Sequence, residues 1–245
     1  MAAETRNESI VMEQSAYDRD LDRNPANFQP LTPLTFLERA ASVYPERVAI
    51  IHGKQRITYR DYYARARRMA AALAARDVGR GDVVSVMLSN TPAMLEAHHG
   101  VPMTGAILHS LNTRLDAAII AFQLDHGEAK VVLVDREFAA VMASAIKRAE
   151  CNPLVINYDD PDYPDDAPFR KGEMIGDLEY EAFIADGDPE FDWQMPADEW
   201  DAISLNYTSG TTGNPKGVVY HHRGAALMGY ANVIASAMEK NPVYL

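Results

Sequence analysis

Cysteine is almost missing from this sequence: the 245 residues include one, Cys151. A lone cysteine cannot form an internal disulfide, and Cys151 has no neighbouring cysteine or histidine at the spacing of a metal site. This usage fits a reducing compartment, where disulfides are rare. We therefore interpret Cys151 as a small buried apolar residue.

A cluster of Lys and Arg that could bind a nucleic-acid backbone is also lacking. The chain has 23 basic and 35 acidic residues, a net charge of −12, and 16 of the acidic residues lie within residues 158–201 beside two basic ones. The arginines at 60, 65, 67 and 68 have the helical spacing of a solvated face. We expect no nucleic-acid partner.

Long hydrophobic runs are absent as well. No stretch is long and apolar enough to span a bilayer, and the first 30 residues are polar, without the apolar centre of a signal peptide. The sequence thus predicts an N-terminal arm over residues 1–30, no membrane partner and a cytoplasmic location.

What the sequence does contain is a regular alternation of two apolar patterns. Short β-rich runs occur at residues 48–51, 83–88, 106–108, 131–134, 154–156 and 203–205. Helical patterns separate them, at residues 34–43, 59–76, 91–102, 115–125, 137–150 and 223–238. Alternation of this kind predicts an α/β fold built of parallel βαβ units and covered on both faces.

Residues 158–201 interrupt the rhythm with five prolines and the local acidic surplus. We interpret them as a surface excursion with one short helix near residues 178–185. The excursion separates a first α/β subdomain, residues 31–157, from the start of a second, residues 202–245.

One loop in the second subdomain has the composition of a phosphate site. Between two predicted strands, residues 208–217 read Thr-Ser-Gly-Thr-Thr-Gly-Asn-Pro-Lys-Gly. Glycines let backbone N–H groups approach an anion, hydroxyls donate to phosphate oxygens, and a lysine neutralises polyphosphate charge. The loop is not a Walker P-loop, because Lys216 stands between Pro215 and Gly217 and a strand follows. Its glycine spacing also differs from the dinucleotide fingerprint.

Residues 207–217 resemble the AMP-binding signature of the adenylate-forming superfamily. Four flanking segments, residues 24–33, 96–102, 111–115 and 220–225, resemble its acyl-CoA synthetase branch. Within that branch they are most similar to 3-methylmercaptopropionate–CoA ligases and to the medium-chain and plant acyl-activating enzymes. The fold implied is the N-terminal part of the adenylate-forming large domain.

The resemblance implies a two-step ligase reaction. A carboxylic acid is adenylated by Mg-ATP with release of pyrophosphate, and the thiol of CoA then attacks the acyl-adenylate. The implied cofactors are ATP, Mg²⁺ and CoA as substrate. Lys216 is the implied catalytic residue, Thr208 the implied Mg²⁺ contact, and the implied contacts to the β- and γ-phosphates are Ser209, Gly210, Thr211, Thr212 and Gly213. The alternative for these residues is a solvated Ser/Thr/Gly turn.

Other residues are weaker candidates for a functional role. His98 and His99 are adjacent, so on a helix they point about 100° apart and do not form the pair that chelates a metal. His221 and His222 follow the loop, and we expect a structural role for His222 and Arg223 at a strand-to-helix junction. Further expectations are that Trp193 and Trp200 pin the acidic excursion and that Asn112 and Arg114 form a turn without a catalytic role.

Members of the resembled family are more than twice as long as this chain. We therefore expect an N-terminal portion that lacks the C-terminal domain and is inactive alone, with an exposed apolar patch or a homodimer that covers it. Two alternatives stay open. One is a ligase for medium-chain or aromatic acids, and the other is a half-length, non-catalytic nucleotide-binding or interaction module.

Overall fold

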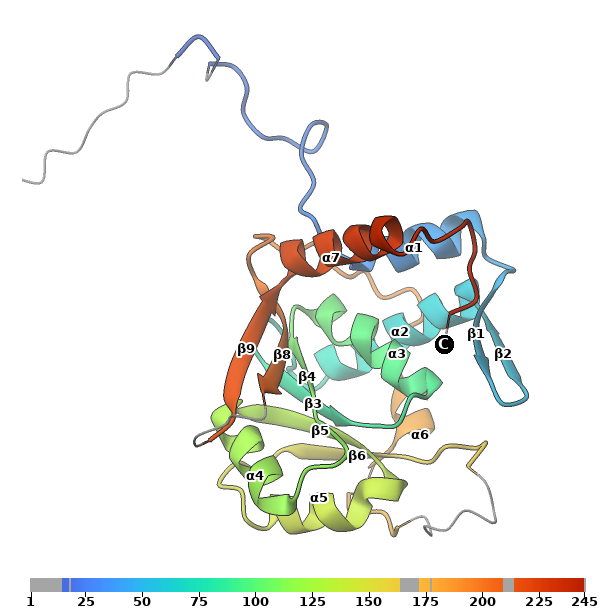
Figure 1. Cartoon of the computed structure of the whole chain (residues 1–245), viewed down its shortest axis with the longest axis vertical. Helices are drawn as coiled ribbons and strands as arrows, with labels where there is room; N and C mark the ends of the chain where they lie inside the picture. The colour runs from blue at the N-terminus through green and yellow to red at the C-terminus, as the bar shows by residue number, and fades with distance from the viewer. Residues whose placement is uncertain (1–14, 18, 164–171, 177, 209–213, 245) are drawn as a thin grey trace, which may run out of the picture.

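The computed structural model describes residues 15–17, 19–163, 172–176, 178–208 and 214–244. In this part of the chain a mostly parallel sheet of seven strands has the order β7-β6-β5-β3-β4-β8-β9, with β9 antiparallel to β8 (Figure 1). The strands are β3 (Val83–Met87), β4 (Ile107–Ser110), β5 (Ala129–Asp135), β6 (Leu154–Tyr158), β7 (Leu178–Glu179), β8 (Ala202–Thr208) and β9 (Lys216–His221). The predicted α/β fold is confirmed.

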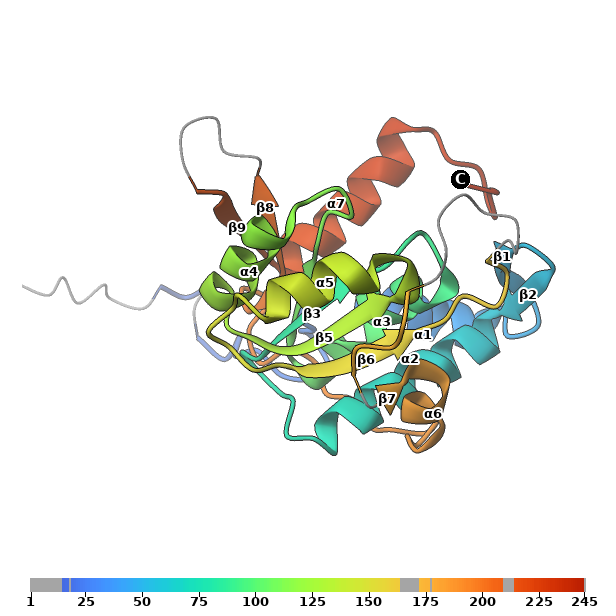
Figure 2. The same ribbon diagram turned by 90° about the horizontal axis from the view of Figure 1, so that it is seen from below.

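Helices cover both faces of the sheet, as Figure 2 shows from below. Helices α4 and α5 pack on one face, and α2, α3 and α6 on the other. Their bounds are α2 (Tyr59–Ala74), α3 (Pro92–Gly100), α4 (Ala117–His126), α5 (Ala139–Ile146) and α6 (Tyr180–Ala185). Short 3₁₀ turns lie at Pro102–Thr104 and Arg136–Phe138.

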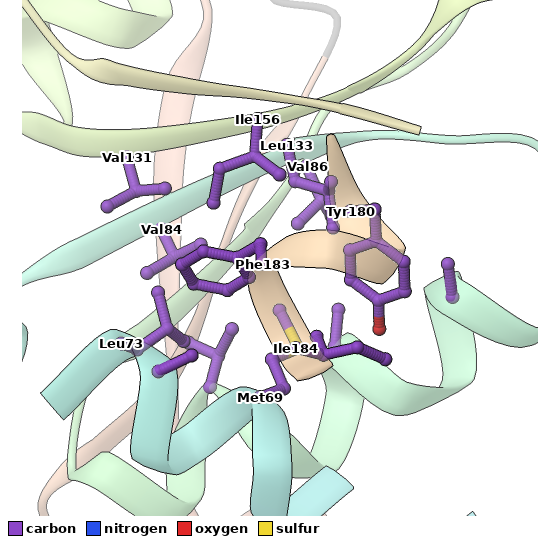
Figure 3. Close-up of a cluster of buried hydrophobic side chains, with 14 of the residues drawn as sticks. Met69, Leu73, Val84, Val86, Val131, Leu133, Ile156, Tyr180, Phe183 and Ile184 are labelled. Carbon is purple, nitrogen blue, oxygen red and sulfur yellow. The ribbon is translucent and has the colours of Figure 1, made fainter. Parts of the chain in front are cut away.

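The core lies between the sheet and the α2, α3, α6 layer (Figure 3). Strand side chains such as Val84 and Leu133 are fully buried there against Leu73 of α2 and Phe183 of α6. Because both faces are covered, β3 and β5 are apolar along nearly their whole length, without the alternation of a half-exposed strand.

Helix α2 begins where the sequence places it. Thr58 is its N-cap, and the Thr58 hydroxyl accepts a hydrogen bond of 3.1 Å from the Asp61 N–H. Ahead of it, β1 (Val48–His52) and β2 (Gln55–Thr58) form a separate antiparallel hairpin that packs with α1 (Leu34–Val43) in a third apolar cluster. Strand β2 was not among the predicted strands.

Residues 158–201 do not all lie on the surface, which corrects the predicted surface excursion. Strand β7 pairs with β6, and Tyr180, Phe183 and Ile184 of α6 are at most 2% exposed. Their three- and four-residue spacing puts them on one helix face, so α6 closes the core despite its acidic flanks. The division into two subdomains stays a prediction, although β8 and β4 share one sheet.

Strand β9 and the helix that follows it, α7 (His222–Ala235), expose many apolar side chains. We use the name β9–α7 face for this set of exposed apolar side chains, which lie on both sides of the edge strand β9 and along α7; they are exposed by 38% to 79%. They are Val218, Val219, Tyr220, Leu227, Met228, Tyr230, Val233 and Ile234. The predicted exposed apolar patch is therefore present. Among the described residues no helix is long and apolar enough to cross a membrane.

Candidate functional site

The two ends of the Gly/Thr loop are fixed by the hairpin of β8 and β9. Thr208 and Lys216 are paired across this hairpin, so the last residue of one strand faces the first residue of the next. The five predicted phosphate contacts between them lie outside the described residues: Ser209, Gly210, Thr211, Thr212 and Gly213. The structure thus brings together Thr208 and Lys216, the two described residues for which the resemblance implies a role.

A pocket of about 210 Å³ adjoins this hairpin end. It opens where β4 and β8 end, and its walls come from these two strands, from the segment between β4 and α4, from α4 and from the residue before β9. Its lining residues are Ser110, Asn112, Leu115, Ile119, Gln123, Asn206, Tyr207, Thr208 and Pro215. The carboxyl ends of parallel strands are where α/β sheets bind ligands, so the pocket is the candidate nucleotide site.

Hydroxyl and amide groups supply the polar lining of this pocket, and no carboxylate lies among the lining residues. Such neutral groups donate hydrogen bonds to phosphate oxygens without repelling them. Lys216 adds a positive charge: it is exposed, and it forms no ion pair with a described residue. The described residues contain no cluster of three or more His, Cys, Asp or Glu that could hold a metal. The neutral donors and Lys216 suit a polyphosphate.

Burial shifts the pKa of Tyr207, which lines the pocket, and of His109, whose ring contacts the Tyr207 ring. Burial raises the pKa of Tyr207, and it lowers the pKa of His109, a β4 residue with 0% exposure, to about 4. Both groups are therefore neutral at pH 7. The Ser85 hydroxyl lies 2.8 Å from His109 Nδ1 and fixes the orientation of the ring.

The histidines after the loop hold α7 in place. His222 Nδ1 lies 2.9 Å from the buried Thr32 hydroxyl, and burial lowers the pKa of His222 to about 4. His221 caps α7 by accepting a hydrogen bond from the Gly224 N–H at Nδ1. Arg223 donates to Glu199, whose other carboxylate oxygen accepts from the Leu31 N–H. These contacts agree with the expected structural role of His222 and Arg223.

The remaining candidates lie away from the pocket or serve local structure. His98 Nδ1 bonds within its own helical turn, while His99 Nδ1 lies 2.7 Å from the Tyr62 hydroxyl, so the two rings share no ligand. Trp193 donates to the Tyr63 hydroxyl and thereby ties residues 189–195 to α2. Trp200 is 66% exposed and packs on His221.

Asn112 differs from this group because it lines the pocket, and its side chain accepts from the Arg114 N–H in the predicted turn. Sequence reasoning assigned no role to Ser110, Gln123 or Asn206, which also line it. The available signal was the position of Ser110 and Asn206 at the ends of neighbouring strands.

A family model and the sequences of known proteins point to the same family. Residues 37–245 match the family model described as AMP-binding enzyme. A peroxisomal acetate/butyrate–CoA ligase of Arabidopsis thaliana is 46% identical over 233 residues, which cover 92% of this chain and 41% of the relative. A peroxisomal benzoate–CoA ligase of the same plant is 44% identical, over 92% of this chain and 40% of the relative. The chain thus spans about two fifths of the relatives' length.

A solved structure shows the same fold at low sequence identity. An anthranilate–CoA ligase in complex with anthranoyl-AMP superimposes with a TM-score of 0.71 and 22% identity, over 82% of this chain and 37% of that one. The parallel sheet with helices on both faces is therefore the arrangement of the adenylate-forming N-terminal domain.

The predicted cytoplasmic location is wrong in the light of these relatives, several of which are named as peroxisomal enzymes. The error has a physical cause. Peroxisomal addresses are short and read by a receptor, so they leave no mark on cysteine usage or on the hydropathy of a chain.

Proposed function

The chain belongs to the AMP-binding enzyme family, and from this membership we propose that it forms the nucleotide-binding part of an AMP-forming acyl-CoA ligase. The observation that carries the proposal is the pairing of Thr208 with Lys216 beside a pocket of neutral hydrogen-bond donors. Relatives that match over about nine tenths of the chain are named as ligases that join carboxylic acids to CoA.

The chemical demand of the first step is control of charge. An anionic carboxylate approaches the α-phosphate of ATP while the departing pyrophosphate gains negative charge. Donors and cations held in place before the reaction stabilise that charge. We propose that Lys216 neutralises the pyrophosphate and that the loop residues Ser209, Gly210, Thr211, Thr212 and Gly213 contact the β- and γ-phosphates. Mg²⁺ bound to the nucleotide would supply further charge neutralisation, with Thr208 as the protein contact.

The acid is proposed at two levels. The class is a monocarboxylic acid, because relatives carry the names of acetate, butyrate, benzoate and cinnamate ligases. Within it, the sequence resemblance favours 3-methylmercaptopropionate, which like butyrate has a short unbranched chain. The test measures pyrophosphate release with short, medium-chain and aromatic acids. It uses a longer protein that contains this chain and has the length of the relatives.

Calorimetric titration of the 245-residue chain with Mg-ATP, and separately with magnesium pyrophosphate, tests the site. Lys216→Ala removes one charge-assisted contact, so we expect roughly ten- to hundredfold weaker binding of both. Lys54→Ala is the matched control, because Lys54 is an exposed lysine in the turn between β1 and β2. Equal binding by the wild-type chain and the Lys216 variant would contradict the proposed role.

We also infer that two copies of the chain pair through the β9–α7 face. Residues 217–238 contain no acidic residue and one arginine, so two such faces meet without repulsion even though the chain is acidic. Strand β9 is an edge of the described sheet, and an edge strand pairs readily with its own copy about a twofold axis.

A further inference from the structure

The hairpin that carries the Gly/Thr loop extends beyond its neighbouring strand. Only two residue pairs join β8 to β4 in the described chain, Leu108 with Ser204 and His109 with Leu205. Residues 206–208 continue in β8 and pair with β9 alone. The end of β8 that leads into the loop is therefore paired on one side only, with the edge strand β9.

A side chain attaches that end of β8 on its other side, to α4. Tyr207 follows Ile203 and Leu205 on one face of β8, because alternate residues of a strand share a face. The Tyr207 hydroxyl lies 2.7 Å from Nδ1 of His126, the last residue of α4. The Tyr207 ring also contacts the rings of His109, at 5.1 Å between centroids, and Phe122, at 6.4 Å.

Two glycines allow this close packing. A Cβ at Gly127, directly after His126, would lie 2.9 Å from the Gln123 carbonyl oxygen and 3.2 Å from Leu205 Cδ2. A Cβ at Gly217 in β9 would lie 3.1 Å from Leu205 Cδ1 and 3.5 Å from Tyr207 Cε1. The backbones of α4 and β9 thus approach Leu205 and Tyr207 as closely as a chain can.

We propose that His126 is a positioning residue for the nucleotide site: through Tyr207 it fixes the hairpin end, and with it Thr208 and Lys216. This inference rests on the proposed function for its consequence, because Thr208 and Lys216 are the residues proposed to contact Mg²⁺ and to neutralise the pyrophosphate. His126 itself does not line the pocket, whereas Tyr207 and Thr208 do.

Backbone amide exchange tests the anchor without any ligand. In His126→Ala and in Tyr207→Phe we expect exchange at residues 206–208 and 216–218 to become several-fold faster, with exchange in β3 and β5 unchanged. His126→Asn is the rescue variant, because the asparagine amide can either donate a hydrogen bond to the Tyr207 hydroxyl or accept one from it. His98→Ala is the matched control, since His98 is an exposed helix histidine that bonds within its own turn. Unchanged exchange in the first two variants would overturn the proposal.

Titration with magnesium pyrophosphate then measures the consequence. One lost hydrogen bond predicts roughly three- to tenfold weaker binding in either single variant. The double variant His126→Ala/Tyr207→Phe should bind no more weakly than either one, because both remove the same contact. Fast exchange with unaltered affinity, or additive losses, would show that the anchor does not position the site. A wild-type chain that binds no polyphosphate would refute the proposed function alone, since the exchange data judge the anchor independently.

Discussion

Strands β5 and β9 have similar apolar sequences and opposite surroundings. Val131 to Val134 of β5 lie between β3 and β6 with helices on both faces, and they are at most 1% exposed. Val218, Val219 and Tyr220 of β9 are 38%, 62% and 46% exposed at the edge of the described sheet. An apolar run therefore predicts a strand, while the neighbours of that strand decide whether the run is buried. The apolar composition of β9 and α7 is that of a surface suited to a partner.

The largest difference in unfolding free energy is expected between an ion pair in the covered interior and one at the start of α7. In the interior, Arg65 Nε donates to Glu96 Oε1 at 2.6 Å, and Glu96 has no exposed surface. Arg65→Ala leaves that carboxylate buried with a neutral donor, the Tyr180 hydroxyl, so we expect a loss of about 3 kcal/mol in the free energy of unfolding. Urea unfolding measures it. Arg223→Ala, at the start of α7, is the comparison, and its unfolding midpoint should shift far less. Equal shifts would remove the distinction between the regions.

Leucine truncation probes packing in the same two places. Leu133 in β5 is fully buried, and Leu133→Ala should cost about 3 kcal/mol through lost burial and a residual cavity. Leu227 in α7 is 44% exposed in the single chain, so at protein concentrations too low for pairing Leu227→Ala should cost less than about 1 kcal/mol. Thermal unfolding of both variants gives the difference. A large loss at Leu227 would mean that the β9–α7 face is already covered in solution.

Acid should weaken the fold through its buried histidines, which besides His109 and His222 include His99 in α3. Burial holds the pKa of His109 in β4 and of His222 in α7 at about 4, whereas an unfolded histidine titrates near 6.5. Below that value the unfolded chain takes up protons that the folded chain excludes, so stability should be constant above pH 7 and fall between about pH 6.5 and 4. Unfolding midpoints across this window measure the effect. His109→Gln and His222→Gln should each flatten the fall, and an unchanged slope in both would contradict the assignment.

A charge introduced by substitution on the β9–α7 face should have the smallest effect on the free energy of unfolding. It should have a clear effect on the pairing of two copies of the chain. Ile234 is 79% exposed in the single chain, so at protein concentrations too low for pairing Ile234→Lys should leave the unfolding midpoint nearly unchanged. It should also shift the chain toward the monomer in sedimentation experiments and reduce the binding of an apolar dye. Lys147→Ala, on the far side of the sheet, serves as the control. A wild-type chain that stays monomeric at high concentration would exclude the proposed pairing.

Local signals in the sequence predicted much of the fold. The capping pair Thr58 and Asp61 with an apolar stripe placed the start of α2, and the expected bounds of α1 agree with the structure. Strand β2 gave no such signal, because its four residues are mixed in polarity and its place depends on the turn at Gly53, where φ is +51°. Helix α6 was expected, but its burial was not, since the acidic flanks concealed its apolar face.

Part of the candidate site could likewise be predicted from local sequence, and part could not. The chemistry of Thr208 and Lys216 could be inferred locally, because hydroxyls, glycines and a lysine follow one another in the chain. The hydrogen bond between Tyr207 and His126 joins residues 81 apart, and Asn112 meets Thr208 only because β4 and β8 are neighbours. Such pairings depend on strand order, which no local pattern specifies.

The contact between Thr32 and His222 has a consequence for the order of events during synthesis. It joins residues 190 positions apart, and the bond from the Leu31 N–H to Glu199 spans 168. A ribosome releases the chain from its N-terminus, so β3, β5 and their helices can assemble while these contacts still lack one partner. Leu31 and Thr32 therefore reach their final place late, after α7 has emerged. Until then a nascent chain would present this segment to chaperones or proteases, whatever the stability of the finished sheet.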